Sequence, residues 1–144
     1  MRKILNFRHA GIVTPNIKKS LNFYLDILNF KLIKKKIEDR KLIKKLLKVK
    51  DGNLTTYKIG LNKKIIIELL DFKIKNKNLK LKLNDNGLTH ISLTVKNIEQ
   101  LVRNLKKYKI SFNSKILRSD DKKVKLVFCK TPEGIYLEFV QINK

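Results

Sequence analysis

The chain has 144 residues, 42% of them apolar, and a formal net charge of +23. This length and apolar content are sufficient for one globular domain with a hydrophobic core. The sequence has no apolar run long enough for a transmembrane helix, and Met1–Gly11 lacks a signal-peptide pattern, so we expect no membrane partner. The single cysteine, Cys129, cannot form an intramolecular disulfide, and we therefore expect a cytoplasmic protein in which it packs as a small apolar side chain.

The positive charge has two interpretations. It could attract a polyanion such as nucleic acid, an anionic membrane or a phosphorylated substrate. Only five of the 35 basic residues are Arg, however, and the lysines occur in nearly every segment. Nucleic-acid surfaces usually combine Arg and aromatic side chains with Lys. We therefore expect no specific nucleic-acid binding, and an advantage for small anionic ligands.

The first elements are predicted between residues 7 and 37. Residues 7–14 are predicted as a strand in which His9 shares a face with Gly11 and Val13. Pro15 ends this strand, and Asn16 caps a helix whose apolar positions follow helical spacing over 17–28. A second strand is predicted over residues 30–37.

The rest of the first half contains an insertion and a strand pair. Residues 38–53 include apolar side chains at helical spacing, which predict a short inserted helix: Leu42, Ile43, Leu46 and Leu47. Strands are predicted over 54–60 and 64–70, and the second has Glu68 in an otherwise apolar run. Residues 71–86 are rich in Lys and Asn and are predicted as a linker.

The second half begins with a strand predicted over 88–96 that contains His90. Asn97 caps a helix whose apolar stripe is Ile98, Leu101, Val102 and Leu105. A strand over 109–117 follows. Strands over 124–130 and 135–142 form the last hairpin, closed by a turn at 131–134 with Pro and Gly at its second and fourth positions. Glu138 is the one carboxylate of the last strand.

The two halves repeat one pattern at a spacing of 81 residues. His90 falls on His9 and Asn97 falls on Asn16. Each half is predicted as a βαβββ module, over residues 7–70 and 87–142, with the linker at 71–86. The sequence thus predicts an α+β fold of two tandem modules that form one domain over residues 1–144.

Four residues stand at equivalent places in the two modules: His9 and Glu68 in the first, His90 and Glu138 in the second. Each His lies on the first strand of its module and each Glu on the last. A carboxylate in an apolar strand is costly to bury unless it is paired or binds a cation. Two imidazoles and two carboxylates suit a divalent Zn, Ni, Co, Mn or Fe ion, whose charge the carboxylates balance. We predict one metal site formed by these four residues.

The repeated module resembles the vicinal oxygen chelate superfamily, which includes glyoxalase I, methylmalonyl-CoA epimerase, extradiol dioxygenases and fosfomycin- and bleomycin-resistance proteins. The resemblance rests on HAGIVTPNIKKSLNFYLDILNFKL, IIIELLDF, GLTHISLTVKNIEQL and VFCKTPEGIYLEFV. It implies a glyoxalase-like fold in which mixed sheets curve into a cup. It also implies a homodimer, with the site formed within one chain or between two.

The set His9, Glu68, His90, Glu138 is similar to the ligand set of bacterial-type lactoylglutathione lyases. This resemblance implies a metal-dependent isomerase or lyase that transfers a proton on a small anionic α-oxo or α-hydroxycarbonyl substrate through a metal-bound enediolate. Glu138 would be the catalytic base, with Glu68 as second choice. The chain has Val13 and Phe72 where those enzymes have an Arg and an Asn that contact glutathione, so glutathione is not implied.

Other functions remain open on the same fold. An activity like that of methylmalonyl-CoA epimerase would use a further carboxylate on the third strand, and residues 54–60 contain none. Dioxygenases use two His and one Glu, which leaves one of the four residues without a role. A non-catalytic, resistance-type binding protein would use the same cup without proton transfer.

Overall fold

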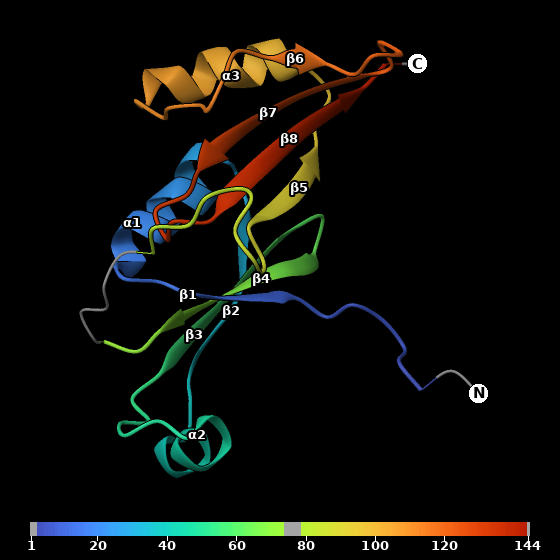
Figure 1. Ribbon diagram of the computed structural model, residues 1–144. Coiled ribbons are helices and arrows are strands. Elements are labelled where there is room, and N and C mark those ends of the chain that lie inside the picture. Colours follow the sequence, from blue (N-terminus) through green and yellow to red (C-terminus); the bar gives the residue numbers. More distant parts are fainter. Residues whose placement is uncertain (1–2, 74–78, 144) are drawn as a thin grey trace. The chain divides into compact units, whose positions relative to one another are not determined.

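The computed structural model describes residues 3–73 and 79–143 (Figure 1). The chain divides into two compact units, residues 1–77 and 78–144. The division falls within the linker predicted at 71–86, of which residues 74–78 lie outside the described residues. In the described part of the chain, no helix is long and apolar enough to cross a membrane.

The first unit contains one four-stranded sheet with the order β1-β4-β3-β2. β1 is parallel to β4, and the other neighbours are antiparallel. Its elements are β1 (Ala10–Val13), α1 (Ile17–Leu21), the π-helix η1 (Asn22–Ile27), β2 (Lys31–Ile37), α2 (Arg40–Leu47), β3 (Thr55–Leu61) and β4 (Lys64–Asp71).

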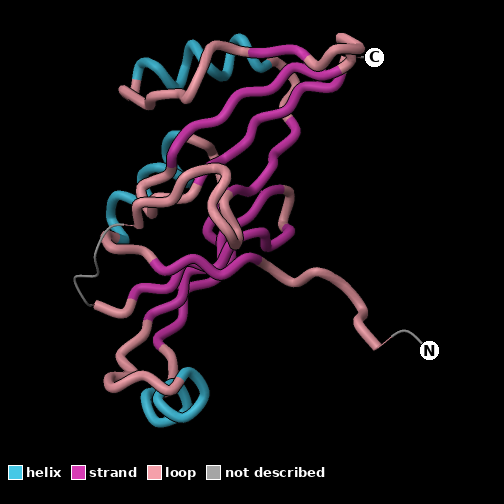
Figure 2. The backbone as a smooth tube through the Cα atoms, in the orientation of Figure 1, coloured by secondary structure: helices cyan, strands magenta, loops and turns pink. Residues whose placement is uncertain are grey.

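The second unit repeats this topology, with a sheet of order β5-β8-β7-β6 in which β5 is parallel to β8 (Figure 2). Its elements are β5 (His90–Thr94), α3 (Ile98–Lys107), β6 (Leu117–Arg118), β7 (Val124–Lys130) and β8 (Tyr136–Ile142). The predicted α+β fold of two tandem βαβββ modules is confirmed, with α2 as an insertion in the first.

Each sheet has one buried face. In the first unit, the buried face contains Tyr57, Ile59, Ile67 and Leu69, which are paired across β3 and β4. In the second, Val127, Cys129, Leu137 and Phe139 are paired across β7 and β8. Because strand side chains alternate, Glu68 and Glu138 lie on the opposite, more open faces.

The helix predicted over 17–28 forms, but its second half is π-helical, and Leu28 N–H donates to Phe23 O. Its buried side chains include Ser20, Phe23 and Tyr24, whereas Leu21 and Leu25, two of the apolar positions at helical spacing, are half-buried. Ser20 tolerates burial because its hydroxyl lies 2.5 Å from Thr14 Oγ1 and donates to Asn16 O.

The strands predicted over 7–14, 88–96 and 109–117 are all clearly shorter than expected, and the second of them forms only as β5 over residues 90–94. β1 covers only residues 10–13, so His9 lies just before it. The strand predicted over 109–117 was wrong apart from its end. Phe112 bridges Cys129, and pairing resumes with Leu117 opposite Leu126. The chain advances five residues between these two pairing positions, whereas β7 advances three. The two extra residues interrupt the hydrogen bonding between the strands.

The inserted helix is confirmed as α2, but its apolar stripe is not a core stripe. Ile43 is buried, whereas Leu42 and Leu46 are 54% and 65% exposed. The helix packs through the side that carries the buried Ile43. The chain passes so closely at Gly52 that a Cβ atom would lie 2.2 Å from Arg40 O.

Cys129 packs as a small apolar side chain, as predicted, and its burial raises the pKa of the thiol to about 12. We expect it to react with a thiol reagent at pH 8 only after denaturation. Between the ordinary cysteine pKa and about 12, the unfolded thiol ionises and the folded thiol does not. Unfolding free energy should therefore fall by about 1.4 kcal/mol per pH unit in that range. Urea titrations of wild type and Cys129→Ala check this, and equal slopes with pH would contradict it.

Candidate functional site

In the first unit, the predicted residues His9 and Glu68 lie side by side. Gly11 on β1 is the register partner of Glu68 on β4, and His9 precedes Gly11 by two residues on the same face. His9 Nε2 lies 3.7 Å from Glu68 Oε1, beyond hydrogen-bond range. His9 Nδ1 is buried and has no hydrogen-bond partner among the described residues. Among the described residues, neither ring nitrogen of His9 therefore makes a hydrogen bond.

Lys58, a residue that the sequence reasoning missed, contacts the same carboxylate. Its Nζ lies 3.4 Å from Glu68 Oε2, and both side chains are largely buried, with 20% and 15% exposed. The register explains this contact. Gly60 pairs with Ile65, but a bulge between Ile59 and Gly60 makes Lys58 face Glu68 instead of Ile67. Gly60 is required because a Cβ atom there would lie 1.7 Å from Lys64 O.

A second carboxylate, Glu38, lies near this pair and was also missed. It follows β2, and it accepts hydrogen bonds from Lys36 Nζ at 2.6 Å and from Thr56 Oγ1 at 2.9 Å. The hydrogen bond from Lys36, with that from Thr56, holds the pKa of Glu38 below its usual range. Glu38 is therefore an ionised carboxylate already committed to protein donors.

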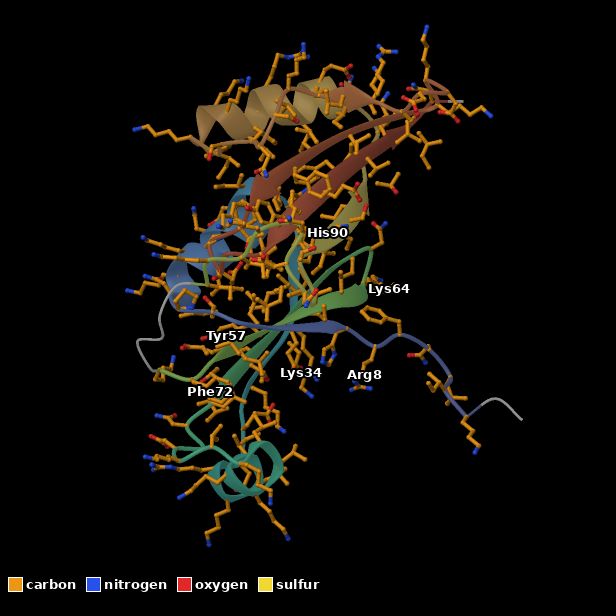
Figure 3. All side chains as sticks on the ribbon, viewed as in Figure 1. Arg8, Lys34, Tyr57, Lys64, Phe72 and His90 are labelled. Carbon is orange, nitrogen blue, oxygen red and sulfur yellow. The ribbon has the colours of Figure 1, made fainter. Side chains whose placement is uncertain are left out.

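In the second unit, His90 opens β5 (Figure 3) and Glu138 lies on the neighbouring β8. His90 Nδ1 lies 3.0 Å from Thr89 Oγ1, and its ring packs edge-on against Phe128 with centroids 5.3 Å apart. When Nδ1 carries the proton and donates a hydrogen bond to Thr89 Oγ1, Nε2 keeps a lone pair for a ligand. Glu138 is half-buried between its register partners Ser92 and Phe128.

The two His–Glu pairs have the same register. Ser92 is the partner of Glu138, as Gly11 is the partner of Glu68, and in each case the His lies two residues earlier. The pairs therefore occupy equivalent positions on the open faces of equivalent sheets. This equivalence was expected because each His was predicted on the first strand of its module and each Glu on the last, and it is now seen in the strand pairing.

The first pair fits a shared metal ion. Two donor atoms that each lie about 2.1 Å from one ion can be at most about 4.2 Å apart, so the 3.7 Å between His9 Nε2 and Glu68 Oε1 is compatible with such an ion. Within neither unit do the described residues bring three or more His, Cys, Asp or Glu together. The predicted ligands are divided two and two between the units, and their convergence on one ion stays a prediction.

A family model described as glyoxalase/bleomycin resistance protein/dioxygenase superfamily matches residues 6–139, which include all four predicted ligands. The chain belongs to this superfamily. The match covers most of both units and includes both His9 and His90.

Solved structures of the superfamily have the same fold. A glyoxalase family protein from Bacillus cereus has a TM-score of 0.84 at 15% identity, with 99% of this chain and 97% of that chain covered. The trypanothione-dependent glyoxalase I of Leishmania major has a TM-score of 0.64 at 20% identity, covering 97% and 87%. Glyoxalase I of Zea mays has a TM-score of 0.73 at 16% identity, covering 95% of this chain and 44% of that one. No curated protein matches the sequence significantly. At these identities the superfamily members share a fold with this chain, and its chemistry has to be argued from its own residues.

Proposed function

We propose that the protein is a metal-dependent isomerase or lyase of the glyoxalase I type, close to the bacterial-type lactoylglutathione lyases in its ligand set. It acts on a small anionic α-oxo or α-hydroxycarbonyl compound. The observation that carries this proposal is the matched register of His9 with Glu68 and of His90 with Glu138. Two independent strand pairs present the same two donor types at the same offset, which is what a two-fold N₂O₂ site requires.

In this proposal His9, Glu68, His90 and Glu138 hold one divalent ion. The donor set suits Zn, Ni, Co, Mn or Fe, and the two carboxylates neutralise the charge of the ion. When bound, the ion acts as a Lewis acid on substrate oxygens, an effect of several kcal/mol on the transition state.

Glu138 is the proposed base that takes the proton from the substrate carbon and returns it to the adjacent carbon. In the part of the chain that the structure describes, no ion pair or hydrogen bond holds its carboxylate. Glu68, in contrast, is ion-paired with Lys58. A proton-transfer group has to change partners during the reaction, and Glu138 is freer to do so.

The rest of the proposal concerns the surroundings of the site. Val13 and Phe72 replace the side chains that contact glutathione in the similar lyases, so the substrate need not be a glutathione adduct. We also propose a homodimer, following the superfamily resemblance. A location in the reducing cytoplasm remains a prediction that rests on the single Cys129.

We expect one divalent ion per chain in protein purified without chelator. His9→Ala and His90→Ala should each lower the metal content by more than half, because each variant leaves three ligands. Elemental analysis measures this, and circular dichroism checks that the variants are folded. Asn16→Ala, at a helix cap beside the first strand, is a control that should keep the metal. The proposal would be contradicted by two weakly bound ions per chain, one of which disappears in His9→Ala and the other in His90→Ala. That result would indicate two separate sites, each formed by one His–Glu pair.

A further inference from the structure

The inference concerns Lys58 and rests on the proposed function. The Glu68 carboxylate is shared between His9 on one oxygen and Lys58 on the other, at 3.7 and 3.4 Å. The other Lys–Glu pairs, Lys36–Glu38 and Lys125–Glu99, are both 2.6 Å apart. Glu68 is thus paired more loosely than Glu38 and Glu99, and a stronger cation can displace its partner.

A divalent ion and the Lys58 ammonium compete for the same carboxylate. An ion bound by two neutral His and two carboxylates forms a set with zero net charge. Lys58 is then left with a positive charge that nothing in the set compensates. Its direct partner across β2 and β3 is Lys34 (Figure 3), a second cation on the same face. Like charges directly opposite each other on a sheet repel, and an anion between them removes the repulsion.

We propose that Lys58 is the residue that selects an anionic substrate, and that metal binding makes it available. Without metal, Lys58 neutralises Glu68 and keeps the half-buried carboxylate from being an unpaired charge. With metal on Glu68, the Lys58 ammonium turns to a carboxylate or phosphate group on the substrate. The site therefore takes a substrate whose anionic group lies next to the reacting carbonyl or hydroxyl group.

A purely structural role for Lys58 predicts a different effect of its removal on stability and on the two affinities. If the lysine only stabilises the sheet, its removal should lower the unfolding free energy and leave the metal and anion affinities as they were. If it is the competitor of the metal and the ligand of the anion, its removal should raise one affinity and lower the other. The proposal therefore predicts that removal of Lys58 raises the metal affinity and lowers the anion affinity.

The test uses Lys58→Met, which keeps the length of the side chain without its charge, and Lys58→Gln as a second variant should Lys58→Met fail to fold. Chelator-treated protein is titrated with Zn²⁺ in a calorimeter. Zn-loaded protein is then titrated with lactate, an α-hydroxy acid anion, and with lactamide, its neutral counterpart. We expect Zn²⁺ to bind about tenfold more tightly to the variant than to wild type. Lactate should bind at least about tenfold more weakly, with lactamide unchanged.

Two control variants distinguish the displacement of Lys58 from Glu68 from the general effect of removing one positive charge. Lys125→Met removes the cation of a Lys–Glu pair in the second unit, whose lysine is 14% exposed, and should change neither affinity. Lys34→Met removes a charge from the same face, without a contact to Glu68, and should change Zn²⁺ affinity less than threefold.

A Lys34→Met effect on Zn²⁺ as large as that of Lys58→Met would overturn the proposal, as would an unchanged Zn²⁺ or lactate affinity in Lys58→Met. Wild-type protein that binds no divalent ion would overturn this proposal and the proposed function together, whereas the other outcomes leave the proposed function standing.

Discussion

Glu138→Gln is expected to retain much of the bound metal while proton transfer on the substrate falls by a factor on the order of 10²–10⁴. Gln keeps the shape of the side chain and an oxygen that can bind the ion, but it cannot accept a proton. Exchange of the substrate α-hydrogen with deuterated solvent, followed by NMR, measures the transfer directly. Elemental analysis of the same sample shows whether the metal is still bound.

Glu68→Gln is the matched comparison, since it makes the same change at the equivalent position. We expect a milder loss of exchange, because Glu138 is the proposed base and Glu68, the second choice, then serves mainly as a metal ligand. Equal large losses in both variants would mean that the two carboxylates share the proton transfer. Little loss in either, in protein shown to be folded and metal-loaded, would remove the catalytic role and favour a non-catalytic binding protein on the same fold.

Phe139→Ala is expected to lower the unfolding free energy of the protein by about 3–5 kcal/mol. Phe139 follows Glu138 on β8, points to the opposite, buried face, and is only 2% exposed. Its register partners are Leu93 on β5 and Val127 on β7, so truncation would leave a cavity at the centre of the second sheet. Urea denaturation followed by circular dichroism measures the change.

Phe7→Ala is the control for this loss. It removes the same side chain from a position that is 72% exposed, and substitutions at such positions usually change stability by less than about 0.5 kcal/mol. A Phe139→Ala cost as small as that of Phe7→Ala would show that the buried face of the second sheet does not contribute the expected core energy. Metal content in Phe139→Ala should fall with the folded fraction, because Glu138 depends on this strand for its position.

Much of the fold, and the choice of the four His and Glu residues as candidate ligands, could be predicted from local patterns in the sequence. The repeat of His9 in His90 and of Asn16 in Asn97 predicted two equivalent modules, since each pattern depends only on strand alternation, a helix cap and apolar spacing. Both Asn side chains do accept the expected backbone hydrogen bonds, from Lys19 N–H and Gln100 N–H. These interactions span a few residues, so the sequence contains all the information that they need.

What depends on pairing between strands was decided only by the tertiary structure. The strand predicted over 109–117 was lost because two extra residues break its ladder with β7. Ser20 is buried in place of Leu21 beside the hydroxyl of Thr14, whose own backbone N–H donates to Leu70 O on β4. Above all, the bulge at Gly60 places Lys58 opposite Glu68. A one-residue change of register moves a side chain to the other face of a sheet, and no local pattern in residues 54–60 specifies it. The four His and Glu residues could therefore be proposed as ligands from the sequence alone, whereas the contact of Lys58 with Glu68 became visible only in the folded sheet.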